Sequence, residues 1–271
     1  MRYMSVILLL IFGCFLEISY AVEVKEEDNF IIVKTTNYEL WWRKSAPMGY
    51  AKVILPDCPE SLIGSAERTF YHASDYAGGW KRWGEMKDFE ILKDEKKRVT
   101  LKFKTRDTQN GGCFEYTLIA TYSDISPYIK HQVNVQNVGG RENLGWPCSG
   151  YDPMFEPHVP ISGKKAWKEP IPHCAYWTEC GFGALYTKPP GRAKLGDWHG
   201  EGDMIQLDHD LLIKLVNPKE SSDTIVYWVA FGKGGEKEAH QIAQMILKEP
   251  EPRVVTPTGK MALTWADIKT K

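Results

Sequence analysis

Hydrophobic and polar residues alternate most regularly between residues 88 and 138. They alternate strictly in Val99–Lys104, and every second residue is apolar or aromatic from Phe114 to Tyr122. Nearly the same spacing recurs from Ile129 to Val135. Because the side chains of a strand point alternately to its two faces, the pattern predicts three successive strands, each with one face in a core and the other in water.

The connections between these strands are short. Asp94–Lys97 is a polar turn, Gln109–Gly112 contains the Asn-Gly pair typical of tight hairpins, and Ser123–Pro127 forms a corner. Parallel strands would need long crossover connections, so the block is expected to be an antiparallel meander.

Segments rich in β-branched and aromatic residues extend the β pattern over most of the chain. Further strands are expected at Asn29–Thr36, Tyr38–Arg43, Tyr50–Leu55, Cys174–Trp177, Phe182–Tyr186, Met204–Leu207, Leu211–Val216 and Thr224–Phe231. One helix is expected where Ala239, Ile242, Ala243 and Ile246 follow the i, i+3, i+4, i+7 spacing before Pro250. The predicted fold class is therefore all-β: an antiparallel β-sandwich with one α-helix in the C-terminal half.

Residues 1–21 have the organisation of a secretory signal peptide: a basic start, a short apolar run, and small residues before a cut after Ala21. A membrane-spanning helix would need about 20 apolar residues, and Glu17 interrupts the run earlier. Lipoprotein processing at Cys14 is the less favoured alternative, because the apolar stretch before it would be very short. We expect a secreted or periplasmic protein whose mature part, residues 22–271, is a single β-sandwich domain without a membrane span.

The overall charge excludes several partners. With 34 Lys and Arg against 35 Asp and Glu, the formal net charge is −1, which disfavours binding to nucleic acid or to an anionic membrane. The sequence also lacks the Gly-x-Ser-x-Gly elbow, a phosphate-binding loop, a dinucleotide fingerprint and the His-Glu-x-x-His motif. Hydrolysis by an activated serine, nucleotide chemistry and zinc proteolysis are therefore disfavoured.

Five of the six cysteines lie after residue 21. In an oxidising compartment, Cys174 and Cys180 are candidates for a disulfide across a small loop. Buried free thiols, which pack as small hydrophobic groups, are the alternative. The odd count leaves at least one thiol free or bonded to another chain.

Two segments carry a family resemblance. Residues 116–129, YTLIATYSDISPYI, form a strand and an acidic corner before Pro-Tyr, and the strand after them ends in VNVQN at residue 137. This pattern resembles the β-supersandwich domain of galactose-mutarotase-like proteins, a domain also found in several polysaccharide lyases. Asn37–Arg43 resembles the first hairpin of such domains. The resemblance implies a supersandwich fold and a carbohydrate substrate class. The catalytic His and Glu contexts of aldose epimerases are not recognisable, so it implies no particular reaction.

The most suggestive polar constellation is residues 197–203, DWHGEGD. If this segment is extended, its alternation projects the carboxylates and the imidazole to one side. His199 and Glu201 are the predicted acid/base pair, and Trp198 is predicted to stack on sugar. Asp197 and Asp203 are the predicted ligands of a Ca²⁺ ion, the one cofactor considered. The alternative is a glycine-rich polar loop that satisfies its own backbone.

A second group lies in residues 78–85. Trp80 and Trp83 offer flat apolar faces for pyranose rings, and Arg82 can pair with a carboxylate, as a uronic acid would require. His131 is a further predicted substrate-binding residue if its face of the sheet lines a cleft. For the tryptophans and the histidine alike, packing in the core is the alternative.

Two hypotheses follow for the function. The first is an exported carbohydrate-binding or carbohydrate-active protein that acts on an oligo- or polysaccharide, with epimerisation or β-elimination as the reactions that would suit the fold. The second is a non-catalytic structural or interaction module of the cell envelope.

Overall fold

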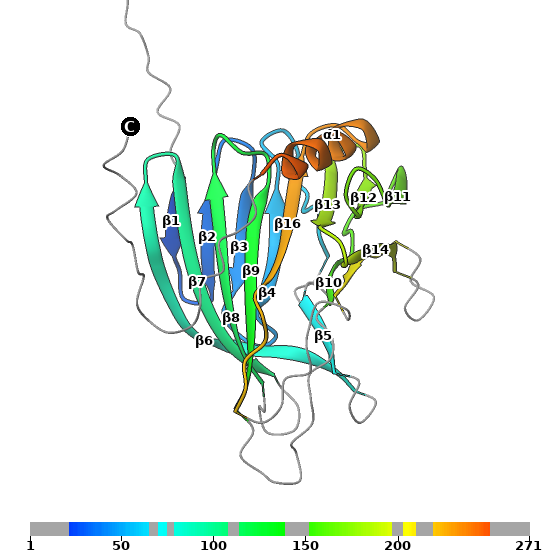
Figure 1. Cartoon of the computed structure of the whole chain (residues 1–271). Coiled ribbons are helices and arrows are strands. Elements are labelled where there is room, and N and C mark those ends of the chain that lie inside the picture. The colour runs from blue at the N-terminus through cyan, green and yellow to red at the C-terminus, as the bar shows by residue number, and fades with distance from the viewer. Residues whose placement is uncertain are drawn as a thin grey trace, which may run out of the picture.

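The computed structural model describes residues 22–64, 70–74, 79–107, 114–138, 152–196, 203–209 and 219–249. Within them, strands from two antiparallel sheets pack face to face, and one helix covers part of the outer surface (Figure 1). The predicted all-β sandwich with one helix is confirmed.

The predicted meander forms the centre of the larger sheet. Its three predicted strands are β7 (Arg98–Asp107), β8 (Phe114–Ser123) and β9 (Ile129–Asn137). A fourth strand, β6 (Gly79–Glu95), which was not predicted, precedes them. Each strand pairs antiparallel with the next. In β7 and β8 buried residues alternate with partly exposed ones, as the sequence pattern predicts. The polar turn between β6 and β7 and the corner between β8 and β9 are also present.

A four-stranded sheet covers the meander. Its strands are β1 (Glu23–Glu26), β2 (Phe30–Lys34), β3 (Glu39–Arg43) and β4 (Gly49–Ile54), hydrogen-bonded in that order. Figure 1 shows these blue strands behind the meander. Alternate residues such as Ile31, Leu40 and Val53 join Leu101 and Leu118 of the meander in one buried cluster, so the main core lies between the sheets.

The larger sheet continues on both sides of the meander and turns back on itself. One side adds β16 (Ile225–Gly232), β13 (Phe182–Thr187), β12 (His173–Trp177) and β11 (Gly163–Trp167), and the other adds β5 (Phe70–Ser74), β10 (Asp152–Phe155), β15 (Ile205–Asp208) and β14 (Arg192–Leu195). The two sides meet, because Cys174 Sγ of β12 lies 3.4 Å from the Gln206 carbonyl oxygen of β15. Ile205 and Leu207 of β15 extend the core there.

The helix α1 (Glu236–Leu247) covers the outer face of β12, β13 and β16 (Figure 1). Its apolar stripe packs on Ala184 and Ala230, and the Tyr186 hydroxyl donates to the Ala239 carbonyl at 2.8 Å. Glu238 accepts a hydrogen bond from the Gly235 amide at 2.9 Å, which fixes the start of the helix. Its position is as predicted.

Polar side chains connect the two sheets inside the core. The Tyr50 hydroxyl of β4 lies 2.6 Å from His131 Nε2 of β9, and His131 Nδ1 lies 2.7 Å from the Tyr227 hydroxyl of β16. Trp42 donates from Nε1 to the Tyr122 hydroxyl at 2.6 Å. Burial lowers the pKa of His131 to about 3, because no water solvates a positive charge there.

The cysteine pairing differs from the prediction. Cys180 is bonded to Cys58, 122 residues away, and not to Cys174. Cys174 is a buried free thiol facing β15, so it packs as a small hydrophobic group, which was the alternative to a disulfide. Burial raises the pKa of the Cys174 thiol to about 12. The sequence offered the short loop as one candidate, but the turn with Cys180 lies against the turn after β4.

Other expectations lie outside the described residues. They are the signal peptide at residues 1–21, the Gln109–Gly112 hairpin turn and the strand at Leu211–Val216. In the part of the chain that the structure describes, no helix is long and apolar enough to cross a bilayer.

Candidate functional site

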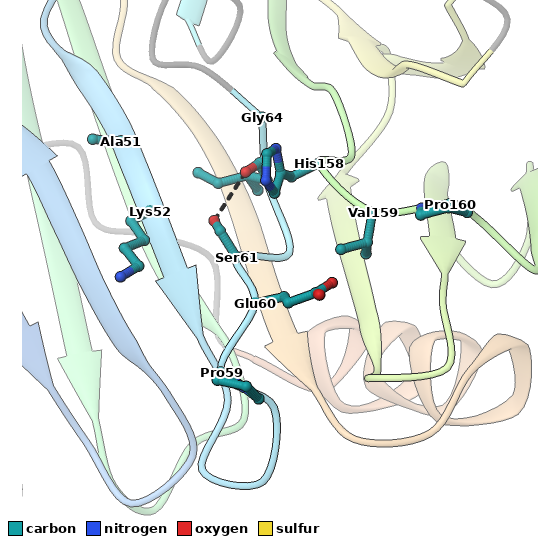
Figure 2. A pocket seen from close by; sticks show the side chains of 10 residues that line it. Ala51, Lys52, Pro59, Glu60, Ser61, Gly64, His158, Val159 and Pro160 are labelled. Carbon is teal, nitrogen blue, oxygen red and sulfur yellow. Dashed lines mark hydrogen bonds between the residues drawn. The ribbon is translucent and has the colours of Figure 1, made fainter.

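A groove of about 530 Å³ lies beside β4, between the turn that follows this strand and the segment after β10 (Figure 2). It is lined by Ala51, Lys52, Pro59, Glu60, Ser61, Ile63, Gly64, His158, Val159 and Pro160. Figure 2 shows the Glu60 carboxylate directed toward Val159 and the His158 ring beside Gly64. We call this hollow the groove.

The wall of the groove is held by backbone pairing with both of its neighbours. After β4 the chain turns and returns, so that the Leu62 amide donates to the Val53 carbonyl at 2.9 Å. On the other side the Gly64 amide donates to the Glu156 carbonyl at 2.7 Å, and Ile63 pairs with Pro157. The disulfide at Cys58 fixes the start of this returning segment. The groove wall is therefore a constrained part of the sandwich.

Ser61 has a structural task in this wall. Its hydroxyl accepts from the Val53 amide at 3.1 Å and donates to the Ile63 carbonyl at 2.9 Å. An activated serine donates its hydroxyl hydrogen bond to a general base. The Ser61 hydroxyl donates to a backbone carbonyl instead, so Ser61 does not have the arrangement of an activated nucleophile.

The charged side chains of the groove point to recognition. Lys52, Glu60 and His158 are all exposed. Together they offer a cation, a carboxylate acceptor and an imidazole within one hollow, which suits hydrogen bonding to hydroxyl groups. They lack the water-excluded surroundings that usually tune catalytic acids and bases.

A smaller hollow of about 350 Å³ continues the groove. It shares Glu60, Val159 and Pro160 with the groove and adds Glu179 and Thr178 from the turn that carries Cys180. The disulfide therefore joins the two turns that place Glu60 and Glu179 around one surface depression.

An aromatic platform adjoins the groove on the outer face of the small sheet. The Lys52 ammonium lies over the Trp41 ring, 5.4 Å from its centroid. Trp41 is partly exposed and is fixed by two contacts: its Nε1 donates to Glu39 at 2.7 Å, and its ring packs edge-on against Phe30 at 5.2 Å. A flat ring held in one orientation can stack on a sugar ring at little entropic cost.

Most of the predicted constellation at 197–203 lies outside the described residues. This applies to Asp197, Trp198, His199 and Glu201, whose roles stay predictions. Asp203 is exposed and forms an ion pair with Lys164 of β11 at 3.2 Å. Among the described residues no group of three His, Cys, Asp or Glu side chains is placed to hold a metal ion.

The second predicted group is only partly described. The backbone of Trp80 and Arg82 lies in β6 and pairs with β5, while their side chains lie outside the description. Trp83 and His131 are both 0% exposed. Their burial favours the core interpretation, since a saccharide in solution does not reach either side chain.

The groove residues were not predicted as a site. His158 stood out only as a histidine among prolines, and Lys52 and Glu60 only as ordinary polar positions of a strand and a turn. The available signal was the proline-flanked segments 56–59 and 157–160, which mark irregular chain between strands. Nothing in the spacing shows that these segments meet.

Comparisons with known proteins give weak likenesses. No protein-family model and no curated protein matches the chain. An active YidC insertase structure has 13% identity and a TM-score of 0.48 over 89% of this chain and 48% of that chain. YidC from Thermotoga maritima has 14% identity and a TM-score of 0.45, covering 84% and 56%. An α-galactosidase from Lactobacillus brevis has 8% identity and a TM-score of 0.46, covering 79% and 41%. This chain spans about half the length of these structures, and likenesses of this size decide nothing about its chemistry.

Proposed function

We propose that the protein is an exported carbohydrate-binding β-sandwich domain that takes part of a glycan chain into the groove. One observation carries the proposal: Trp41, a partly exposed ring held by Glu39 and Phe30, lies beside Lys52 at the edge of a polar hollow. Saccharide sites combine an aromatic face for the C–H side of a pyranose with polar groups for its hydroxyls.

Binding is favoured over catalysis at this site. The Ser61 hydroxyl donates its hydrogen bond to a backbone carbonyl and not to a general base. Glu60 and His158 are solvent-exposed, so they lack the buried surroundings that tune a catalytic acid or base. Epimerase-like or lyase-like activity stays a prediction that depends on His199 and Glu201. A lyase absorbance assay and a sugar-epimerisation assay test it with the His199→Ala and Glu201→Gln variants beside the parent protein. Equal rates in all three proteins would remove these two residues as the catalytic pair.

The proposal of export depends on residues 1–21. Expression of the whole chain in a bacterial host, followed by mass spectrometry of the periplasmic fraction, is expected to find a mature chain that begins at Val22. Recovery of the intact chain from the cytoplasm would contradict it.

Affinity gel electrophoresis tests binding directly. Gels contain galactomannan, xyloglucan or mixed-linkage β-glucan as neutral polysaccharides, or polygalacturonate as an acidic one. The native domain is expected to be retarded in at least one gel. Trp41→Ala should weaken binding about tenfold, because it removes the stacking surface, and Glu60→Gln should weaken it less, because an amide oxygen still accepts a hydrogen bond.

A matched control separates stacking from a general loss of surface. Leu92 of β6 is 43% exposed and lies on another sheet, so Leu92→Ala removes apolar area away from the groove. This variant should bind like the native domain. If no gel retards the folded protein, the proposed function is wrong. If Trp41→Ala binds unchanged, the groove is not the site.

A further inference from the structure

A row of four rings crosses the outer face of the larger sheet. Trp167, His173, Tyr186 and Trp228 are successive cross-strand partners on β11, β12, β13 and β16. Trp167 stacks on His173 with ring centroids 4.5 Å apart and planes 7° from parallel. His173 in turn stacks on Tyr186 at 5.5 Å and 12°. The row begins at β11, which is the last strand of the larger sheet on this side among the strands that the structure describes.

Hydrogen bonds lock His173 inside this row. Its Nδ1 lies 2.7 Å from the Ile171 carbonyl, which only accepts, so Nδ1 carries the proton. Burial, followed by the neighbouring His240, lowers the pKa of His173 to about 4, so the ring is neutral at pH 7 and its Nε2 is an acceptor. His240 Nδ1, at 3.1 Å, must therefore donate to it.

This proton arrangement determines what His240 presents. With its Nδ1 held by His173, the His240 ring has Nε2 as its remaining nitrogen for a ligand. His240 is partly exposed on α1, and its ring lies 5.7 Å from that of Trp167. A polar ring nitrogen of fixed orientation thus lies beside an indole of fixed orientation.

The Trp167 ring is partly exposed. His173 covers one face of the ring, and the ammonium of the exposed Lys165 side chain lies over the ring, 5.3 Å from its centroid. A sugar that stacks on the indole must therefore displace the Lys165 side chain. Lys165 also pairs with Glu236 of α1 at 2.6 Å, so the charges beside the ring cancel. A flat apolar surface, an imidazole nitrogen and a neutralised ion pair suit a neutral hydroxyl-rich ring better than a charged one.

We propose that Trp167 and His240 form a second saccharide-binding site, in which one neutral pyranose stacks on the indole and one of its hydroxyl groups hydrogen-bonds to His240 Nε2. The site stands on the ring row and its hydrogen bonds and is independent of the groove. It lies on the edge strand β11 and helix α1, whereas the groove lies beside β4.

Affinity gel electrophoresis in the neutral polysaccharides galactomannan, xyloglucan and mixed-linkage β-glucan tests the site in the Trp41→Ala background, where binding in the groove is weakened about tenfold. Residual retardation is expected there. Adding Trp167→Ala should weaken the residual binding about tenfold, and adding His240→Ala should weaken it about threefold. Trp167→Phe keeps a flat ring and should retain most of the binding. Melting curves check that each variant is folded.

The outcomes separate the two sites. If Trp167→Ala and His240→Ala leave the retardation unchanged, the second site is wrong whether or not the groove binds. If Trp41→Ala alone has no effect while Trp167→Ala weakens binding, the groove proposal fails and the second site stands. If Trp167→Ala does not fold, His240→Ala decides, because alanine is a strong helix former and removes only the imidazole. No retardation of the native protein in any of the three gels overturns the second site.

Discussion

At the scale of the residue, His131 shows how much of a core depends on one polar side chain. The sequence places it on an apolar strand face, where a partner is required if it is buried. Its partners Tyr50 and Tyr227 are 81 and 96 residues away. No local pattern connects positions so far apart, so the burial was predictable and the network was not.

Removal of this imidazole should destabilise the sandwich. In the His131→Leu variant the Tyr50 and Tyr227 hydroxyls lose a hydrogen-bond partner inside the core. We expect the free energy of unfolding to fall by about 2 to 4 kcal/mol, measured by denaturant titration. His131→Gln keeps polar atoms near both hydroxyls and should lose less. Equal stability of the leucine variant and the native protein would show that the network contributes nothing.

At the scale of the element, strands with alternating burial were predictable and edge strands were not. The strands β7, β8 and β9 and the helix α1 follow the sequence pattern closely because each buries a periodic face. The strands β12, β13 and β16 are buried on both faces, and their β-branched and aromatic residues predicted them. In contrast, β1 (EVKE) and β14 (RAKL) are short, charged and largely exposed. They form strands because a neighbouring strand offers backbone hydrogen-bond partners. Each has only four residues and no buried face, so the pattern of apolar residues could not predict them.

The disulfide between the turns after β4 and β12 should stabilise the fold considerably. It closes a loop with a sequence separation of 122, which strongly restricts the unfolded chain. The Cys58→Ser, Cys180→Ser double variant is expected to lose about 3 to 5 kcal/mol of unfolding free energy, measured by thermal melting without reductant.

The control for this experiment is Cys174→Ala, which changes a buried free thiol and no bridge. It should lose much less. If the double variant has the same melting temperature as the native protein, the disulfide does not contribute to stability. The double variant also tests the groove, because Glu60 and Glu179 come from the two joined turns.

At the scale of the whole molecule, the candidate site is a product of topology. The groove unites residues 51–64 with residues 158–160, which meet through backbone pairing between Ile63 and Pro157. The sequence indicated which segments are irregular but not which of them meet. The way the larger sheet turns back so that β15 faces β12 was equally hidden, since it depends on long-range pairing.

The whole molecule should also lose stability in mild acid. Burial holds the pKa of His131 at about 3 and that of His173 at about 4, while both histidines titrate near 6.5 in an unfolded chain. Between about pH 6.5 and 3 the unfolded state therefore binds more protons, so the stability present above pH 6.5 is lost as the pH falls.

Denaturant midpoints measured from pH 8 to pH 3 test this expectation. Carboxylates add their own dependence below about pH 5, so the decisive comparison is with His131→Gln. The glutamine variant should lose less stability between pH 6.5 and 4 than the native protein. Parallel profiles would mean that His131 is not the source.

The exposed edges of the sandwich have a consequence for behaviour at high concentration. Among the described strands, β1, β11 and β14 lie at the edges of the two sheets and carry Lys, Arg or Glu side chains. The outer side of β4 is partly covered where Leu62 pairs with Val53. Unpaired backbone groups at such borders would otherwise recruit strands from neighbouring molecules, and charge or a covering segment hinders that recruitment. The protein should therefore resist fibril growth at high concentration, and exchanging these charges for valine should make it prone to aggregate.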